Sequence, residues 1–177
     1  MVWGLTLETF TAVHVVLSLI GIGAGLVVLV GLIASRRLDR WTGLFLATTI
    51  ATCVTGFGFP VDHVLPSHIV GVLSLVVLAV AIVALYARHL RGAWRAIYAV
   101  AVGLALYFNV FVGVVQAFLK VPALHALAPQ QTEAPFVAAQ LFAKGFDLAR
   151  GIFHQALIYN LTRNSENSPS HLTGIRF

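Results

Sequence analysis

Four apolar runs, separated by short polar segments, dominate the hydrophobic pattern of the chain. Each is close to the length of about 20 residues that a helix needs to cross a bilayer. In lipid the backbone has to satisfy its own hydrogen bonds, so runs of this length predict helices rather than strands. The four runs cover residues 9–34, 41–60, 69–87 and 96–119.

The polar connectors carry different charges at the two ends of these runs. SRRLDR joins the first two runs and RHLRGAWR joins the last two, and each contains three arginines. Apart from histidines, Lys120 is the single basic residue of the alternate segments up to residue 135. The positive-inside rule therefore predicts that the loops at residues 35–40 and 88–95 are cytoplasmic and that the N-terminus lies outside.

A fifth segment, about residues 136–161, has an amphipathic pattern. At 100° per residue its charged and amide side chains share one face, and leucines and phenylalanines cover the other. Placing Lys144, Asp147 and Arg150 at the bilayer centre costs about 2.5–3.5 kcal/mol each, and the apolar residues return roughly half of that. The segment therefore lies in the interface, or it spans with its polar face against protein. We favour a fifth span packed in an assembly, with Asp147 and Arg150 as a candidate ion pair.

Composition agrees with a membrane protein. The chain of 177 residues is 59% hydrophobic and 10% charged, against about 45–50% and about 25% in soluble domains. Its net charge of +5 lies mainly in the connectors, which indicates topology rather than a nucleic-acid-binding surface. No basic residue precedes the first run, which is too long for a signal peptide, so we expect it to remain as a span. The predicted fold is an all-α integral membrane helical bundle over residues 1–162, with a disordered polar tail over 163–177.

The stretch GFGFPVDHVLPSH, between the second and third runs, concentrates ionisable side chains at the outer rim. Imidazole and carboxylate groups are suitable ligands for zinc, copper, iron or nickel. Hydrogen bonding at the membrane edge or between helices is the competing interpretation of such histidines. The candidate metal ligands are His14, Asp62, His63 and His68, and haem b held between His14 and His68 is a narrower alternative.

Small and polar residues recur at helical spacing within the runs. His14, Ser18, Gly21 and Gly25 form one stripe, and the pair of glycines four residues apart is typical of close helix packing. We therefore expect His14 to face a neighbouring helix. The other candidate packing or lining residues are Thr48, Thr52 and Thr55 on the second run and Asn109 and Gln116 on the fourth.

Two stretches, FPVDHVLPSHIVG and LYFNVFVGVVQAFLKVPALHALAP, resemble a group of small bacterial multi-pass membrane proteins of uncharacterised activity. The resemblance covers about residues 40–140 and implies a bacterial inner-membrane setting. The fifth segment is more charged here than the resemblance leads us to expect.

No catalytic residue is predicted, because the sequence contains no P-loop, GxSxG, HExxH or dinucleotide fingerprint. Cys53 is the single cysteine, which excludes an internal disulfide and a CxxC site. Three interpretations of function remain: a binding protein with a metal or haem at the outer rim, a structural subunit of a homo-oligomer or of a complex with partner subunits, and a small channel or transporter.

Overall fold

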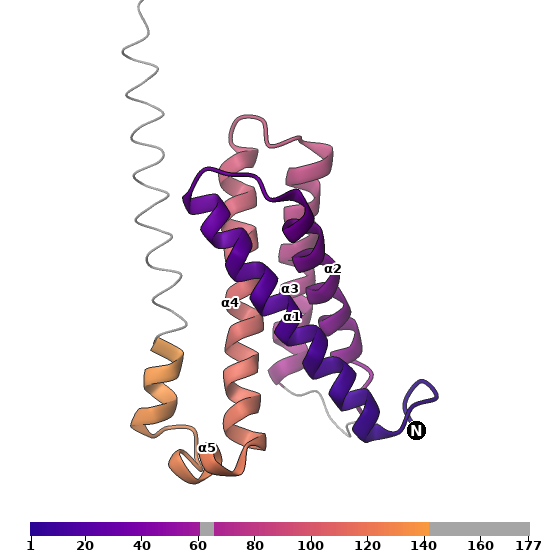
Figure 1. Ribbon diagram of the computed structural model, residues 1–177, viewed down its shortest axis with the longest axis vertical. Helices are drawn as coiled ribbons and strands as arrows, with labels where there is room; N and C mark the ends of the chain where they lie inside the picture. Colours follow the sequence, from indigo (N-terminus) through magenta and orange to yellow (C-terminus); the bar gives the residue numbers. More distant parts are fainter. Residues whose placement is uncertain (61–65, 142–177) are drawn as a thin grey trace, which may run out of the picture.

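The protein is a bundle of long α-helices in a computed structural model, which describes residues 1–60 and 66–141 (Figure 1). Within these ranges there is no β-strand, and Val2 and Leu5 form an isolated bridge before the first helix. The elements are α1 (Leu7–Ile33), α2 (Asp39–Gly56), α3 (Pro66–Ile82), the π-helical turn η1 (Val83–Ala87), α4 (Trp94–Lys120) and α5 (Pro122–Leu127).

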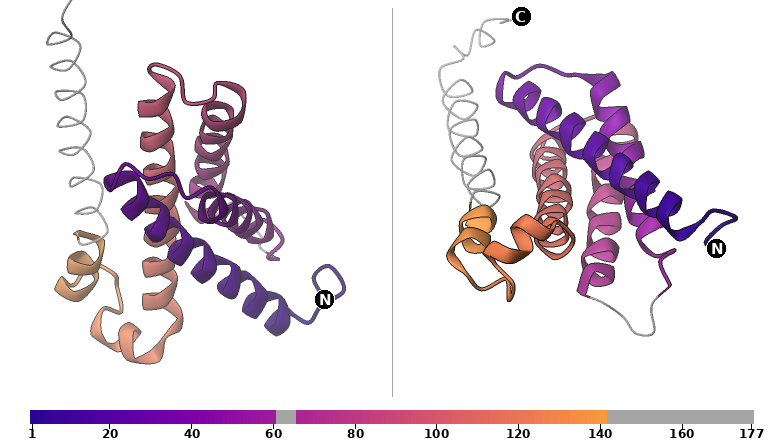
Figure 2. Two further views of the ribbon diagram at one scale, coloured as in Figure 1. Left: turned by 45° about the horizontal axis from the view of Figure 1, so that its top comes forward. Right: turned by 60° about the horizontal axis from the view of Figure 1, so that its bottom comes forward.

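The four long helices run alternately up and down. The two arginine-containing connectors lie at one end of the bundle, and the start of α1, the start of α3 and α5 lie at the other (Figure 1). α1 crosses obliquely to α4, and it packs on both α2 and α4 (Figure 2). The bundle therefore has an arginine end and an opposite end, which we call the histidine end because His14, His68 and His125 lie there.

Among the described residues, three helices are long and apolar enough to cross a membrane: α1, α3 extended through η1, and α4. This is one fewer than the four spans expected from the sequence. α2 falls short because it begins with Asp39 and Arg40 and has five threonines among its 18 residues. The chain between residues 57 and 60 is no longer helical, so α2 also ends before the predicted boundary.

Other boundaries agree with the sequence to within a few residues. Residues 69–87 correspond to α3 with η1, and α4 is longer than the predicted run by two residues at the start and one at the end. α5 was not predicted, and Pro122 occupies its first turn, where proline is well tolerated. Of the fifth segment, residues 136–141 are helical; the remainder, with the predicted Asp147–Arg150 pair and the tail from residue 163, lies outside the described residues.

Glycine lets α1 approach its neighbours closely. A Cβ atom added at Gly25 would lie 2.7 Å from Cδ1 of Leu106 and 2.9 Å from the ring of Phe45. Phe45 is fully buried and Leu106 is 4% exposed, so neither side chain has free space to move into. The contact between α1, α2 and α4 therefore depends on the missing side chain.

The connector between α3 and α4 is a tight turn. His89, Leu90 and Gly92 all have positive φ, an unfavourable conformation for the two non-glycine residues. Leu90 packs against the hydrophobic core, which holds the turn in place. The guanidinium of Arg88 lies 4.9 Å from the ring centroid of Trp94, so the two ends of the connector are in contact.

Substitution of Gly25 by valine is expected to destabilise the bundle by about 1–3 kcal/mol, because the added methyl groups overlap Leu106 and Phe45. The measurement is the free energy of unfolding in mixed micelles. The matched control is Gly23→Val on the same helix, where an added Cβ would meet nothing within 4 Å. Equal losses at both positions would contradict this packing.

Candidate functional site

The predicted histidine ligands lie near the histidine end of the bundle. His14 is half-buried on α1, and His68 is half-buried in the first turn of α3. Asp62 and His63 lie outside the described residues. Among the described residues, no group of three or more His, Cys, Asp or Glu side chains is close enough to hold a metal ion. Of the four proposed ligands, the described residues therefore include His14 and His68, and no third ligand there completes a metal site with them.

His14 is hydrogen-bonded to α2. Its Nδ1 atom lies 2.8 Å from Oγ1 of Thr55. The Thr55 hydroxyl donates to the carbonyl oxygen of Ala51 at 2.7 Å, so its oxygen accepts from His14. This assignment puts the ring proton of neutral His14 on Nδ1 and leaves the lone pair on Nε2. One ring nitrogen thus connects two helices, and the other is the only one available to a ligand.

Aromatic side chains cover His14 at this end. Phe59 meets the imidazole edge to face at 5.2 Å between ring centroids, and Phe10 packs on Phe59 at 5.0 Å. Trp3 packs in turn on Phe10 at 5.4 Å. His68 is stacked on Phe57 with centroids 5.7 Å apart. Each histidine therefore contacts a different phenylalanine beyond the end of α2.

The polar stripe of α1 lies against the threonines of α2. Ser18 donates to the carbonyl oxygen of His14 at 3.0 Å and lies 3.5 Å from Oγ1 of Thr52. One turn further, a Cβ atom added at Gly21 would lie 3.2 Å from the hydroxyl oxygens of both Thr48 and Thr49. The polar face of α2 is thus turned toward α1.

α4 closes this stripe near the middle of the bundle. The side-chain nitrogen of Asn109 would lie 3.0 Å from a Cβ atom at Gly21. Asn109 is 9% exposed and Thr49 is 1% exposed. Asn109 Nδ2 and Thr49 Oγ1 are buried without a hydrogen-bond partner among the residues described. A buried polar group left in this state costs about 1–3 kcal/mol.

The stripe ends toward the arginine end of the bundle. Beyond Gly21 the side chains that meet α1 are Phe45 and Leu106, packed at Gly25, and both are buried. In the other direction Gln116, which continues the polar positions of α4, is exposed on the surface of the described chain. The polar side chains of α1, α2 and α4 therefore form an internal seam from His14 to Asn109, bounded by apolar packing.

Sequence reasoning missed two parts of this arrangement. Phe10 lies four residues before His14, so its place on the same stripe was available from helical spacing. Thr49 was passed over because it lies about 100° around α2 from Thr48. Its contact with Gly21 depends on the angle at which α1 crosses, which the spacing does not contain.

Comparisons with protein-family models, with curated proteins and with solved structures find no match to this chain. The arrangement of the seam is therefore the basis for inferring function.

The hydrogen bond between His14 and Thr55 is expected to couple α1 to α2 by about 0.6 kcal/mol and at most about 1.7 kcal/mol, the range for membrane interiors. The measurement is a double-mutant cycle of unfolding free energy with His14→Phe and Thr55→Val.

The control cycle pairs His14→Phe with Thr42→Val, because the Thr42 hydroxyl lies 3.4 Å from that of Tyr98, near the opposite end of α2 from Thr55. Coupling in the control cycle as large as in the first would show that the energy does not come from this bond.

Proposed function

We propose that the chain is a non-enzymatic structural subunit of a membrane assembly, in which the polar side chains at membrane depth hold helices together. The hydrogen bond from His14 to Thr55 supports this most directly. It engages the single imidazole of α1 in a contact between helices. Ser18, Gly21 and Asn109 lie in the same kind of contact.

The proposal includes α2 as a fourth membrane span. α1 ends at the arginine end and α3 begins at the histidine end, and α2 runs between them (Figure 1). Four of the five threonines that lower its apolarity face α1, as the contacts of Thr48 and Thr55 illustrate, whereas Thr42 lies 3.4 Å from the hydroxyl of Tyr98 on α4. Its exposed positions include apolar Leu44 and Val54, which suit contact with lipid. Covering the polar face in this way makes a crossing by α2 favourable despite its composition.

The arrangement of the connectors supports the proposed orientation. The segments at residues 34–40 and 88–95, each with three arginines in its sequence, lie at the same end of the bundle (Figure 1). The positive-inside rule then favours a cytoplasmic arginine end and an N-terminus outside. A bacterial inner membrane is the proposed location, as the sequence resemblance implies.

A metal-binding or channel function has less support from the described residues. Beside His14 and His68, no third His, Cys, Asp or Glu side chain of the described residues completes a group that could hold a metal ion. A channel needs a polar path between the two ends, and Phe45 and Leu106 fill the space beyond Gly21. Both features favour helix packing as the role of the seam.

Two features favour an assembly: the exposed Gln116 of α4 and the charged residues in the sequence of the fifth segment. Gln116 is exposed about one turn from the end of α4, where a side-chain amide suits a hydrogen bond to a neighbouring helix. The fifth segment carries Lys144, Asp147 and Arg150, and in a membrane such charges need a protein surface.

Extraction of the protein with its surrounding lipid is expected to yield a particle containing more than one chain of 19.0 kDa. Gln116→Leu removes the exposed amide and should shift the particle toward single chains, as measured by native mass spectrometry. The matched control is Gln131→Leu, because the Gln131 amide donates within the chain to the carbonyl oxygen of Val115 at 3.3 Å.

The control variant should keep the wild-type stoichiometry. A monomer that carries one metal ion or haem per chain, lost on His14→Ala, would overturn the proposal in favour of the binding function.

A further inference from the structure

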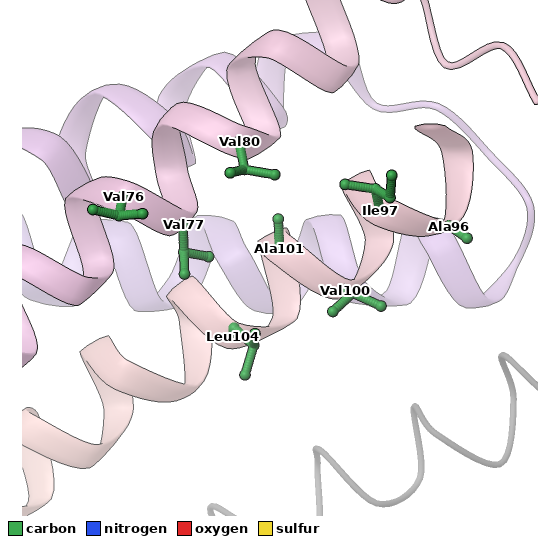
Figure 3. A pocket seen from close by; sticks show the side chains of 8 residues that line it. All are labelled: Val76, Val77, Val80, Ala96, Ile97, Val100, Ala101 and Leu104. Carbon is green, nitrogen blue, oxygen red and sulfur yellow. The ribbon is translucent and has the colours of Figure 1, made fainter. Parts of the chain in front are cut away.

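An apolar groove lies between α3 and α4 on the surface of the bundle. Its volume is about 310 Å³, at the lower end of the range for small-ligand sites. α3 lines one wall and α4 the other, with Val77 of α3 pointing toward α4 and Ala101 of α4 pointing toward α3 (Figure 3). The lining residues are Val76, Val77, Val80, Ala96, Ile97, Val100, Ala101 and Leu104.

The groove is open to its surroundings. Val76 is 58% exposed, Val80 39% and Val100 38%, whereas Ala101 at its floor is 4% exposed. The alanines at positions 96 and 101 leave the hollow between the larger side chains. In a membrane such an opening faces lipid.

The groove lies within one leaflet. On α4 it extends over nine residues from Ala96 to Leu104, a rise of about 12 Å along the helix. The hydrocarbon of one leaflet is about 15 Å thick, half of the bilayer core. Ala96 is two residues from Trp94, at the arginine end. The depth and direction of the groove thus match those of an acyl chain in the leaflet next to the arginine connectors.

A cation lies near the start of α4, because Arg88 contacts Trp94, two residues before the lining residue Ala96. The Arg88 guanidinium is held 4.9 Å from the ring centroid of Trp94. Stacking on an aromatic ring leaves the N–H edge of guanidinium free to bind phosphate oxygens. Arg88 is exposed, so a lipid headgroup can reach it.

We infer that this groove binds one acyl chain of an anionic glycerophospholipid, with the headgroup phosphate held by Arg88 on Trp94. The apolar lining accommodates the acyl chain, and Arg88 favours a lipid with an anionic headgroup. Because the lining is apolar and exposed to the bilayer, a lipid already in the leaflet enters without crossing a barrier. This inference is independent of the assembly proposed above.

Arg95 provides an internal control for this geometry. At 100° per residue it lies on the opposite side of α4 from the positions that line the groove. It has the same charge and lies at the same end of the bundle. A local site therefore depends on Arg88, whereas a general attraction of anionic lipid to positive charge treats the two arginines alike.

The test is native mass spectrometry of the full chain, in detergent with phosphatidylglycerol or with phosphatidylcholine of the same acyl chains. We expect phosphatidylglycerol to be retained preferentially. Arg88→Gln should lower the ratio of the two bound lipids about fivefold, and Arg95→Gln should leave it unchanged.

Filling the groove tests the position of the acyl chain. Val80→Phe combined with Val100→Phe should abolish the retained lipid. Val30→Phe, at an exposed position of α1 that does not line the groove, should not. Circular dichroism of each variant is the control that it is folded.

Three results would overturn the inference. They are equal losses with Arg88→Gln and Arg95→Gln, lipid binding that survives in the double phenylalanine variant, and a dimer without bound lipid that the double variant dissociates. The last result would assign the groove to a second copy of the chain.

Discussion

The cover that α1 provides for the threonines of α2 is the interaction on which the rest of the bundle depends. Five hydroxyl-bearing residues on an 18-residue helix make it a poor membrane span by itself. α1 presents a matching stripe of small and polar side chains, with His14 bonded to Thr55 and Gly21 beside Thr48. Four of the five threonines of α2 thereby face α1, and the exposed positions of α2 include apolar Leu44 and Val54. A helix that fails a hydropathy criterion can in this way belong inside the bilayer.

The same close approach has an energetic cost. Gly21 and Gly25 have no side chains, so α2 and α4 can come near α1. This brings Thr49 and Asn109 into a buried site where an oxygen and a nitrogen have no hydrogen-bond partner within the described part of the chain. Each such group costs about 1–3 kcal/mol, more than a single interhelical hydrogen bond in a membrane returns. Packing of Phe45 and Leu106 at Gly25 therefore has to offset part of this cost.

Much of the fold was predictable because a bilayer imposes a simple length rule on apolar runs. The boundaries of α1, α3 with η1, and α4 follow from it, and the helical spacing of His14, Ser18, Gly21 and Gly25 indicated a face turned toward protein. Contacts that depend on the crossing angles between helices were not predictable from the sequence. The meeting of Gly21 with Thr49 and Asn109 depends on how α1 crosses, and α5 depends on a proline whose effect is local. The groove between α3 and α4 requires small residues of α4 to face α3, which periodicity alone does not specify.

The most direct test of this account is the side of the membrane on which each connector lies, since that decides whether α2 crosses. Single cysteines at positions 35, 91 and 130, in a chain with Cys53→Ala, are treated in intact cells with a membrane-impermeant maleimide. If α2 is covered by α1 and spans, positions 35 and 91 are protected together and position 130 is labelled. Labelling of 35 and 91 on opposite sides of the membrane would mean that α2 does not cross, and the account would be wrong.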